Sequence, residues 1–276
     1  MMLEQGEVVV DELRIHYAAC GPKGGHPVLL VHGWPTSSRL WREVMPALGE
    51  AGARAIAIDL PGFGGSSKPP GASYSFRFYD RAIDGFLTAL GVETLDLVVH
   101  DLGGPLGLHW AALHPARVRR LGLLNTIVYP QLSWAVVAFV AASKLPGVKQ
   151  WLTSPRGLAW AMQFGVARKL APDEIAAYQA PFAEHDARVA LRKAAGGNLH
   201  RDGMREIERY IQQLTIPVRV IYGDRDPILP EVGKTFARVK RDVPHAEVTV
   251  LAGAKHFVQE DRPREVAELL AQFLSP

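Results

Sequence analysis

The stretch Leu97-Val98-Val99-His100-Asp101-Leu102-Gly103-Gly104 decides the predicted fold of this chain. An apolar run that is typical of a buried strand ends at Asp101, and two glycines then open a helical pattern over residues 105–114. This order of strand, turn and helix is the frame of a nucleophile elbow, a sharp turn that lifts one side chain above the end of a sheet. Asp101 occupies the nucleophile position, where such elbows usually carry serine. The alternative is that Asp101 only caps the N-terminus of the following helix.

A carboxylate in this position narrows the chemistry. A serine alkoxide attacks acyl carbon and forms an ordinary ester, whereas a carboxylate attacking acyl carbon would form a reactive mixed anhydride. A carboxylate that attacks saturated carbon forms an alkyl ester, which water can later hydrolyse. Aspartate also needs no base to activate it, because its reference pKa is about 3.9. Asp101 therefore indicates displacement at saturated carbon, at either a carbon–halogen bond or an epoxide.

Short apolar runs alternate with helical patterns along most of the chain. The predicted strands are residues 7–10, 14–17, 28–31, 55–58, 97–99, 121–124, 218–222 and 248–251. Continuous apolar strands of this length belong in a parallel sheet that helices cover on both faces, and the first two predict an antiparallel hairpin at its edge. The predicted helices are residues 38–50, 79–90, 105–114, 231–239 and 264–273. We therefore predict an α/β fold with a mostly parallel central sheet.

Residues 129–213 break this alternation, since they carry helical patterns, aromatic side chains and prolines but no clear strand. We predict that residues 129–213 form a helical lid, inserted into a core domain of residues 1–128 and 214–276. The length of 276 residues and the hydrophobic content of 48% suit one domain with such an insertion. Most of the lid tryptophans are expected to pack within the lid.

Composition and charge exclude several kinds of partner. The formal net charge of +3 comes from basic residues that are spread along the chain, so we predict no nucleic-acid partner. The single cysteine, Cys20, excludes an internal disulfide. The most apolar stretch, Trp134–Ala142, is shorter than the roughly 20 residues that span a bilayer, and the N-terminal residues have no signal pattern. We expect a soluble cytoplasmic protein without membrane insertion. Its oligomeric state stays open.

Two further candidate catalytic residues follow later strands. Asp226 follows the strand at 218–222, and His256 follows the strand at 248–251. The chain order of nucleophile, acid and histidine is one of the known orders of a catalytic triad. His256 is expected to take a proton from water, and Asp226 to orient its ring and to stabilise its positive charge. Asp224 is the alternative acid, although its position is more typical of a turn.

The stretch His32-Gly33-Trp34-Pro35 follows the strand at 28–31. We expect the backbone N–H groups of Trp34 and Leu102 to form an oxyanion hole for the charge that builds on an ester carbonyl oxygen. His32 is expected to stabilise its own loop. The glycine-rich residues 59–66 lack the spacing of a dinucleotide site, and no His, Cys and Asp cluster has metal-ligand spacing. We therefore predict neither a cofactor nor a metal.

Together these residues resemble the α/β-hydrolase superfamily and, within it, the haloalkane dehalogenases. The matching stretches are residues 32–42, 61–69, 98–104 and 256–261. The resemblance extends over nearly the whole chain. It implies that Asp101 is the nucleophile, His256 the base and Asp226 the acid, and that the partners are a small apolar organic substrate and water.

One position departs from the dehalogenase pattern. That pattern has a tryptophan directly after the nucleophile, whose indole N–H holds the departing halide, but this chain has Leu102. Trp34, Trp134 and Trp151 are therefore candidate halide donors. Tyr178 is a further candidate for substrate contact, because residues 177–182 also look like the lid of that family.

The resemblance leaves other activities open. Epoxide hydrolases of the superfamily share the aspartate nucleophile and use lid tyrosines to protonate the opening oxygen. Tyr129, Tyr178 and Tyr210 lie in or beside the predicted lid. Fluoroacetate dehalogenases usually carry an arginine after the nucleophile, so Leu102 argues against an acidic substrate held in that way. An esterase, or a ligand-binding sensor of the same fold, completes the alternatives.

Overall fold

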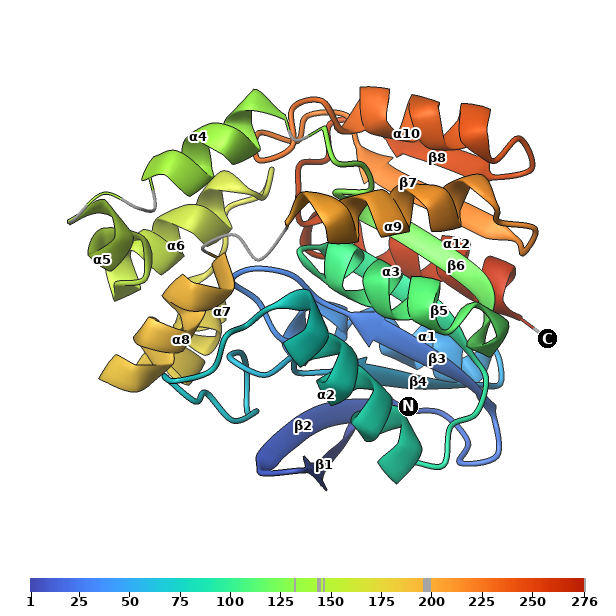
Figure 1. The fold of residues 1–276 in the computed structure, drawn as a ribbon, viewed down its shortest axis with the longest axis horizontal. Coiled ribbons are helices and arrows are strands. Elements are labelled where there is room, and N and C mark those ends of the chain that lie inside the picture. The colour runs from blue at the N-terminus through green and yellow to red at the C-terminus, as the bar shows by residue number, and fades with distance from the viewer. Residues whose placement is uncertain (132, 143–144, 146, 196–199, 276) are drawn as a thin grey trace.

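In the computed structural model, one eight-stranded sheet runs through the molecule (Figure 1). The structure describes residues 1–131, 133–142, 145, 147–195 and 200–275, so the predicted lid includes positions that lie outside the described residues. The strands are β1 (Glu4–Val10), β2 (Leu13–Cys20), β3 (His26–Val31), β4 (Ala53–Ile58), β5 (Leu95–Asp101), β6 (Val118–Thr126), β7 (Val218–Gly223) and β8 (Glu247–Leu251).

The order of strands in the sheet is β1-β2-β4-β3-β5-β6-β7-β8. Strand β2 pairs antiparallel with β1 and with β4, and the other neighbouring pairs are parallel. All seven residues of β5 are buried, as expected of a strand that is covered on both faces. The predicted α/β fold, with its edge hairpin, is therefore confirmed.

Helices cover both faces of the sheet. Helices α2 (Phe76–Ala89), α3 (Gly103–Leu113), α9 (Arg201–Gln212) and α10 (Val232–Asp242) contribute to one buried cluster, and α1 (Met45–Glu50) and α12 (Pro263–Leu274) to the other. Phe86 and Ile207 represent the first cluster, and Leu48 and Leu270 the second. The molecule thus has three layers, and the C-terminal ends of the parallel strands are where a site is expected.

The predicted helix over residues 38–50 is divided in the structure. A short 3-10 turn, η1 (Ser38–Trp41), precedes α1, which begins at Met45 with Pro46 in its first turn. Pro46 has no backbone N–H to continue an earlier helix, so a new helix begins there. Another 3-10 turn, η2 (Pro115–Arg117), precedes β6, and the short helix α11 (Val258–Asp261) begins two residues after His256.

The described residues between β6 and β7 form helices joined by loops and contain no strand. They include α4 (Trp134–Ala142), α5 (Val148–Leu152), α6 (Pro155–Phe164), α7 (Pro172–Gln179), the 3-10 turn η3 (Ala180–Phe182), α8 (His185–Ala195) and α9. Helices α4 to α8 stand together at one end of the molecule, whereas α9 packs against α3 over the sheet (Figure 1). The lid boundaries at residues 129 and 213 stay a prediction.

Among the described residues, no helix has the length and apolar character needed to cross a bilayer. The same residues contain no cluster of three or more His, Cys, Asp or Glu side chains that would hold a metal ion. Cys20 is buried at the end of β2 with a free thiol.

Candidate active site

Asp101 stands at a strained turn between β5 and α3. Its φ of 50° lies in the left-handed region, where a non-glycine residue is uncommon. The turn depends on small neighbours, because a Cβ on Gly103 would lie 2.4 Å from the carbonyl oxygen of His32, and one on Gly104 would lie 1.6 Å from Thr126 Oγ1. The Thr126 hydroxyl donates a hydrogen bond to the Asp101 carbonyl oxygen at 2.6 Å. These contacts fix the backbone so that the carboxylate projects above the sheet.

The Asp101 carboxylate does not cap α3. The N-cap residue of that helix is Leu102, and the helix has no side-chain cap. Instead, Asp101 Oδ1 accepts a hydrogen bond from the backbone N–H of Trp34 at 2.7 Å. Burial alone would raise the pKa of Asp101, but His256 and the Leu102 N–H outweigh it and hold that pKa below its usual value. Both predicted oxyanion-hole donors therefore stabilise the ionised carboxylate.

His256 lies between two carboxylates. Its Nε2 is 3.3 Å from Asp101 Oδ2, its Nδ1 is 2.8 Å from Asp226 Oδ2, and the ring is fully buried. Burial alone would lower the pKa of His256, but Asp226 and Asp101 together raise it to about 10. In this state the imidazolium is sandwiched between two negative charges, and its ring orientation is fixed from both sides.

Asp226 is held by groups that complete its hydrogen bonding. Its Oδ1 accepts from the backbone N–H groups of Ile228 and Leu229, each at 2.8 Å, and Oδ2 accepts from Asn125 Nδ2 at 2.8 Å in addition to His256. Burial alone would raise the pKa of Asp226, but His256 lowers it below its usual value. A buried carboxylate with this many donors stays ionised.

The structure places Asp224 in a turn. Its carboxylate accepts from the backbone N–H of Gly253 at 2.7 Å in an exposed loop, rather than facing His256. His32 stabilises its own loop: Nδ1 lies 2.9 Å from the Gly33 carbonyl oxygen, and Nε2 accepts from the Leu60 N–H at 3.1 Å. Burial lowers the pKa of His32, so the neutral ring that both bonds require is favoured.

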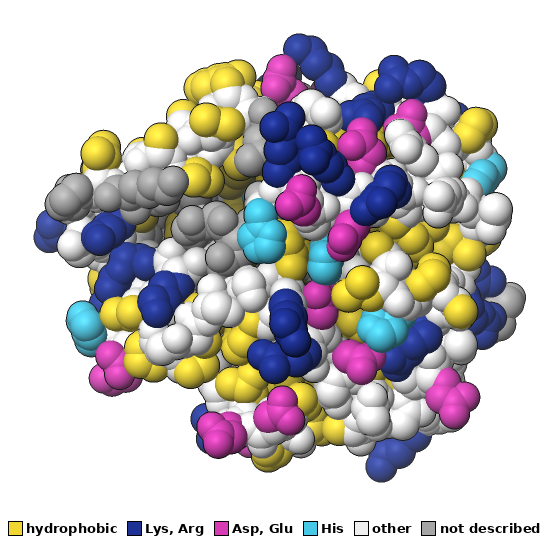
Figure 2. All heavy atoms as spheres, in the orientation of Figure 1, with side chains coloured by type: hydrophobic (Ala, Val, Ile, Leu, Met, Phe, Trp, Pro, Cys, Tyr) yellow, Lys and Arg dark blue, Asp and Glu magenta, His cyan; other side chains and the backbone are white. Residues whose placement is uncertain are grey.

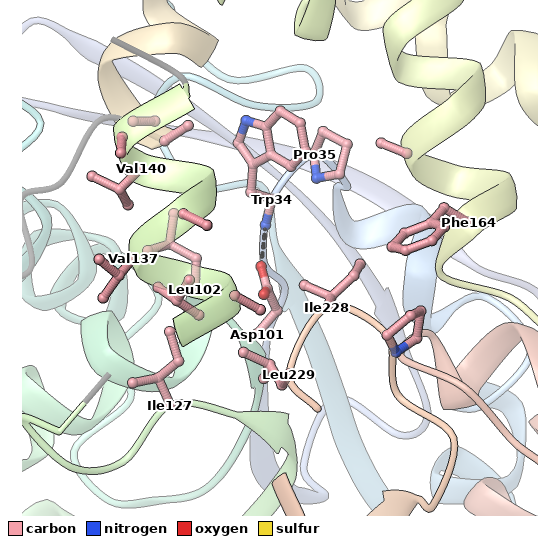
Figure 3. Close-up of a pocket in the computed structure, with 18 of the residues that line it drawn as sticks. Trp34, Pro35, Asp101, Leu102, Ile127, Val137, Val140, Phe164, Ile228 and Leu229 are labelled. Atoms are coloured by element: carbon pink, nitrogen blue, oxygen red, sulfur yellow. Dashed lines mark hydrogen bonds between the residues drawn. The ribbon is translucent and has the colours of Figure 1, made fainter. Parts of the chain in front are cut away.

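A cavity of about 760 Å³ opens above Asp101. Its wall is almost entirely apolar, with side chains from the β3 loop, α3, α4, α6 and the loop after β7. The lining residues are Trp34, Pro35, Tyr74, Tyr79, Asp101, Leu102, Leu106, Ile127, Trp134, Ala135, Val136, Val137, Ala138, Val140, Ala141, Trp160, Ala161, Phe164, Ala194, Ala195, Pro227, Ile228, Leu229 and Phe257. Figure 3 shows Asp101 among these side chains, with Val137 and Val140 on one side and Phe164 on the other. Asp101, the one acidic residue among those that line the cavity, thus faces an apolar space.

The comparisons with known proteins agree with this arrangement. The α/β-hydrolase fold family matches residues 26–263. The chain is 30% identical to the haloalkane dehalogenase of Agrobacterium fabrum over 95% of this chain and 89% of that protein. It is also 30% identical to the haloalkane dehalogenase of Mycobacterium marinum, over 93% of this chain and 87% of that protein. The chain belongs to the haloalkane dehalogenase family of α/β-hydrolases.

Solved structures agree with this membership. The crystal structure of the haloalkane dehalogenase DatA from Agrobacterium tumefaciens C58 superposes with a TM-score of 0.87 at 26% sequence identity, and the match covers 99% of this chain and 96% of DatA. Haloalkane dehalogenase DbeA from Bradyrhizobium elkani gives a TM-score of 0.85 at 26% identity, covering 99% and 97% of the two chains. This member of the haloalkane dehalogenase family is therefore a hydrolase with the complete core fold.

The structure brings some of the predicted substrate-contact residues of this dehalogenase-family chain to the cavity and leaves others outside. Trp34 and Trp134 line the cavity. Trp151 lies outside the lining and packs against Trp160, with ring centroids 5.6 Å apart. Tyr178 is also outside the lining, and its hydroxyl donates to Glu260.

Glu260 joins the inserted helices to the core. Its buried carboxylate accepts from Tyr178 on α7, from Arg42 after η1, and from Arg168 between α6 and α7. Burial alone would raise the pKa of Glu260, but the Arg42 guanidinium leads the groups that lower it. Tyr178 thus serves to attach the insertion near His256, and it does not face the cavity.

Sequence reasoning missed two residues that contact the site. Asn125, at φ 31°, donates to Asp226 and accepts from the Gly223 N–H at 3.2 Å, so it ties β6 to β7 behind the acid. His100 Nε2 lies 3.0 Å from the carbonyl oxygen of His256, and burial lowers the pKa of His100 to about 3. Neutral His100 is therefore the donor in that bond. The sequence signal that could have found both residues is their position, because each is a polar side chain near the C-terminal end of a buried strand, His100 in β5 and Asn125 in β6.

Proposed function

We propose that this protein is a haloalkane dehalogenase, which converts an apolar haloalkane and water into an alcohol and a halide ion. The observation that carries this proposal is the ionised carboxylate of Asp101 at the base of a large apolar cavity, with His256 3.3 Å away. A carboxylate in a dry apolar site is a strong nucleophile, and an apolar wall fits a haloalkane better than a polar substrate.

In the first step, Asp101 Oδ2 attacks the carbon that bears the halogen, and the halogen leaves with the bonding electron pair. Oδ1 then becomes the carbonyl oxygen of the alkyl ester, and it already accepts a hydrogen bond from the Trp34 N–H at 2.7 Å. The Trp34 side chain also lines the cavity, as does Trp134. We propose the indole N–H groups of these two tryptophans as halide donors, because Leu102 carries none.

In the second step, water attacks the ester carbonyl carbon. Alkylation has removed the negative charge of Asp101, which is one of the two charges that raise the pKa of His256. His256 therefore releases its proton more readily at the ester stage, and its Nε2 then takes a proton from the attacking water. Charge develops on Oδ1, where the Trp34 and Leu102 N–H groups stabilise it; losing one such donor typically costs about 10²–10³ in rate. Asp226 keeps the ring in orientation throughout.

The tyrosines argue against the epoxide alternative, which needs a hydroxyl to protonate the opening oxygen. Two tyrosines line the cavity, and the hydroxyl of each donates to a backbone carbonyl, Tyr74 to Pro69 and Tyr79 to Pro61. Tyr129 and Tyr178 donate to Asp242 and Glu260, away from the cavity, and Tyr210 is not among the residues that line it.

We further propose that α4 to α8 act as a lid. Helix α4 supplies Trp134, Val137 and Val140 to the cavity wall, and α6 supplies Trp160 and Phe164. Because these helices are inserted between β6 and β7, they close the cavity above the ends of the strands. Exclusion of water there strengthens the electrostatic interactions of Asp101 and His256.

Halide release by the purified protein tests the proposed activity. Incubation with short and longer bromoalkanes is expected to release bromide together with one equivalent of the matching alcohol, and the Asp101→Ala variant is expected to release none. The Asp224→Asn variant is the matched carboxylate control, because Asp224 faces a turn, and it should keep the wild-type rate. Equal halide release by wild type and Asp101→Ala would overturn the proposal, as would epoxide hydrolysis by a folded protein that releases no halide.

A further inference from the structure

The end of the molecule formed by α4 to α6 exposes an unusual amount of apolar surface. Among the described residues, six of the twelve exposed large hydrophobic side chains lie between positions 134 and 164. We call these six side chains the apolar face; they are Trp134, Val137, Leu145, Trp151, Trp160 and Phe164. Figure 2 shows hydrophobic side chains gathered over this end of the molecule. Exposed apolar side chains that gather at one end of a molecule often mark an interaction site.

Aromatic rings dominate the apolar face. Trp151 of α5 lies 5.6 Å from Trp160 of α6, and Trp160 stacks on Phe164 at 4.9 Å between ring centroids. Three of the six tryptophans of the chain are exposed here, with Trp134 exposed by 70%. Tryptophan is enriched where one side of a ring meets lipid and the other meets water.

The segment that carries this face has basic residues but no acidic ones. The chain has no Asp or Glu from residue 102 to residue 172, although acidic residues number 28 in all. The same region has five basic residues between positions 131 and 172, which are Lys144, Lys149, Arg156, Arg168 and Lys169. Arg168 pairs with Glu174 and Glu260, whereas Lys149 and Arg156 form no ion pair with any described residue. Lys149 on α5 and Arg156 on α6 therefore border the aromatic row as unneutralised charges.

A second copy of the chain fits this face poorly. In a symmetric dimer the same patch meets itself, so the Lys149 and Arg156 charges of both copies would enter one interface, and the segment has no acid to offset them. An anionic lipid surface offers negative charge for the basic residues and an apolar layer for the tryptophans. Such docking needs no spanning helix.

We propose that the α4–α6 end docks on an anionic lipid surface. Four of the six side chains of the apolar face, Trp134, Val137, Trp160 and Phe164, also line the cavity. Docking therefore places the wall of the cavity against the lipid, which is where an apolar haloalkane concentrates. This last consequence rests on the proposed dehalogenase function, whereas the docking itself does not.

Vesicle flotation with the purified full chain, in the absence of substrate, tests the docking. Wild type is expected to float with vesicles of phosphatidylcholine and phosphatidylglycerol far more than with phosphatidylcholine alone, and added salt should weaken this binding. The double variant Lys149→Gln, Arg156→Gln is expected to bind about twenty-five-fold more weakly, because each basic residue near an anionic surface contributes about fivefold. Tryptophan fluorescence should shift to the blue when wild type binds.

The matched control is Arg77→Gln with Arg81→Gln, which removes two exposed positive charges from α2 and should leave binding unchanged. Trp151→Ala, outside the cavity lining, is expected to weaken binding through lost apolar contact. Equal flotation with both kinds of vesicle, or no flotation, would overturn the proposal. So would light scattering that shows a dimer of wild type and a monomer of the Lys149, Arg156 variant. Halide release without vesicles separately reports on the proposed function.

Discussion

The Asp226→Asn substitution is expected to slow the second proposed step, ester hydrolysis, and to leave the first step, alkylation of Asp101, largely unchanged. In the structure, Asp226 Oδ1 accepts from two backbone N–H groups, and Oδ2 accepts from His256 Nδ1 and Asn125 Nδ2. The asparagine oxygen would keep the two backbone donors, so its NH₂ group would face His256 Nδ1. That ring nitrogen must then become an acceptor, and the proton moves to Nε2. His256 in this tautomer cannot take a proton from water.

The magnitude of this effect differs between the steps. In serine proteases, a related Asp-to-Asn change that fixes the wrong histidine tautomer costs about 10⁴ in rate, or about 5.5 kcal/mol. We expect a loss of about 10⁴ in ester hydrolysis by Asp226→Asn. The alkylation step uses the ionised Asp101 and no base, so it should keep most of its rate.

Rapid mixing with excess bromoalkane measures both steps at once. The Asp226→Asn variant should release one bromide per protein in a fast burst and then turn over about 10⁴-fold more slowly than wild type. Asp224→Asn, whose partner is only the Gly253 N–H, should show wild-type kinetics. Steady turnover by Asp226→Asn at the wild-type rate would refute the role given to Asp226. Loss of the burst itself would refute the independence of the first step.

Further predictions concern the halide site, the elbow and pH. Leu102→Trp adds an indole N–H at the cavity wall. Because a hydrogen bond to a charged group contributes about 1.5–3 kcal/mol, the turnover of chloroalkanes should rise roughly tenfold or more. Unchanged rates on matched chloro- and bromoalkanes would contradict this prediction. Gly104→Ala places a Cβ 1.6 Å from Thr126 Oγ1 and should lower the free energy of unfolding, measured in urea, by about 1–3 kcal/mol. The control Gly71→Ala, whose Cβ meets open space, should leave the stability unchanged. Equal stability of the two variants would argue against the close packing of the elbow. Because the folded-state pKa of His256 is raised from 6.5 to about 10, its contribution to stability is complete below pH 6.5 and is lost as pH rises through about 10. The free energy of unfolding of wild type relative to His256→Ala should fall across that range, and a constant difference would contradict the assigned shift.

The elements that hold the site were predictable because strands have strong local signals. The continuous apolar runs predict β3, β5 and β7 in the interior of the sheet, and the site residues Trp34, Asp101 and Asp226 lie at or just beyond their C-terminal ends. Asp101 was predicted as a nucleophile from the strand–turn–glycine pattern alone, and the positive φ and the close approach at Gly104 give the physical reason for that pattern.

Residues outside the strand framework were harder to place. Trp151 and Tyr178 lie on helices of the insertion, where no sheet fixes the direction in which a side chain points. Tyr178 faces Glu260, and Trp151 faces Trp160, through tertiary packing that no local pattern encodes. The bond from Asn125 to Asp226 joins two strands that are about 100 residues apart in the chain, so neither residue alone predicts it.

Mass spectrometry of a trapped ester tests the central claim most directly. In His256→Ala, alkylation of Asp101 should proceed while hydrolysis stops, so the protein incubated with bromobutane should gain one butyl group in place of a proton. Fragmentation should locate that group on Asp101, and the double variant Asp101→Ala, His256→Ala should gain nothing. No adduct on folded His256→Ala while wild type releases bromide, or an adduct on any residue other than Asp101, would contradict the account.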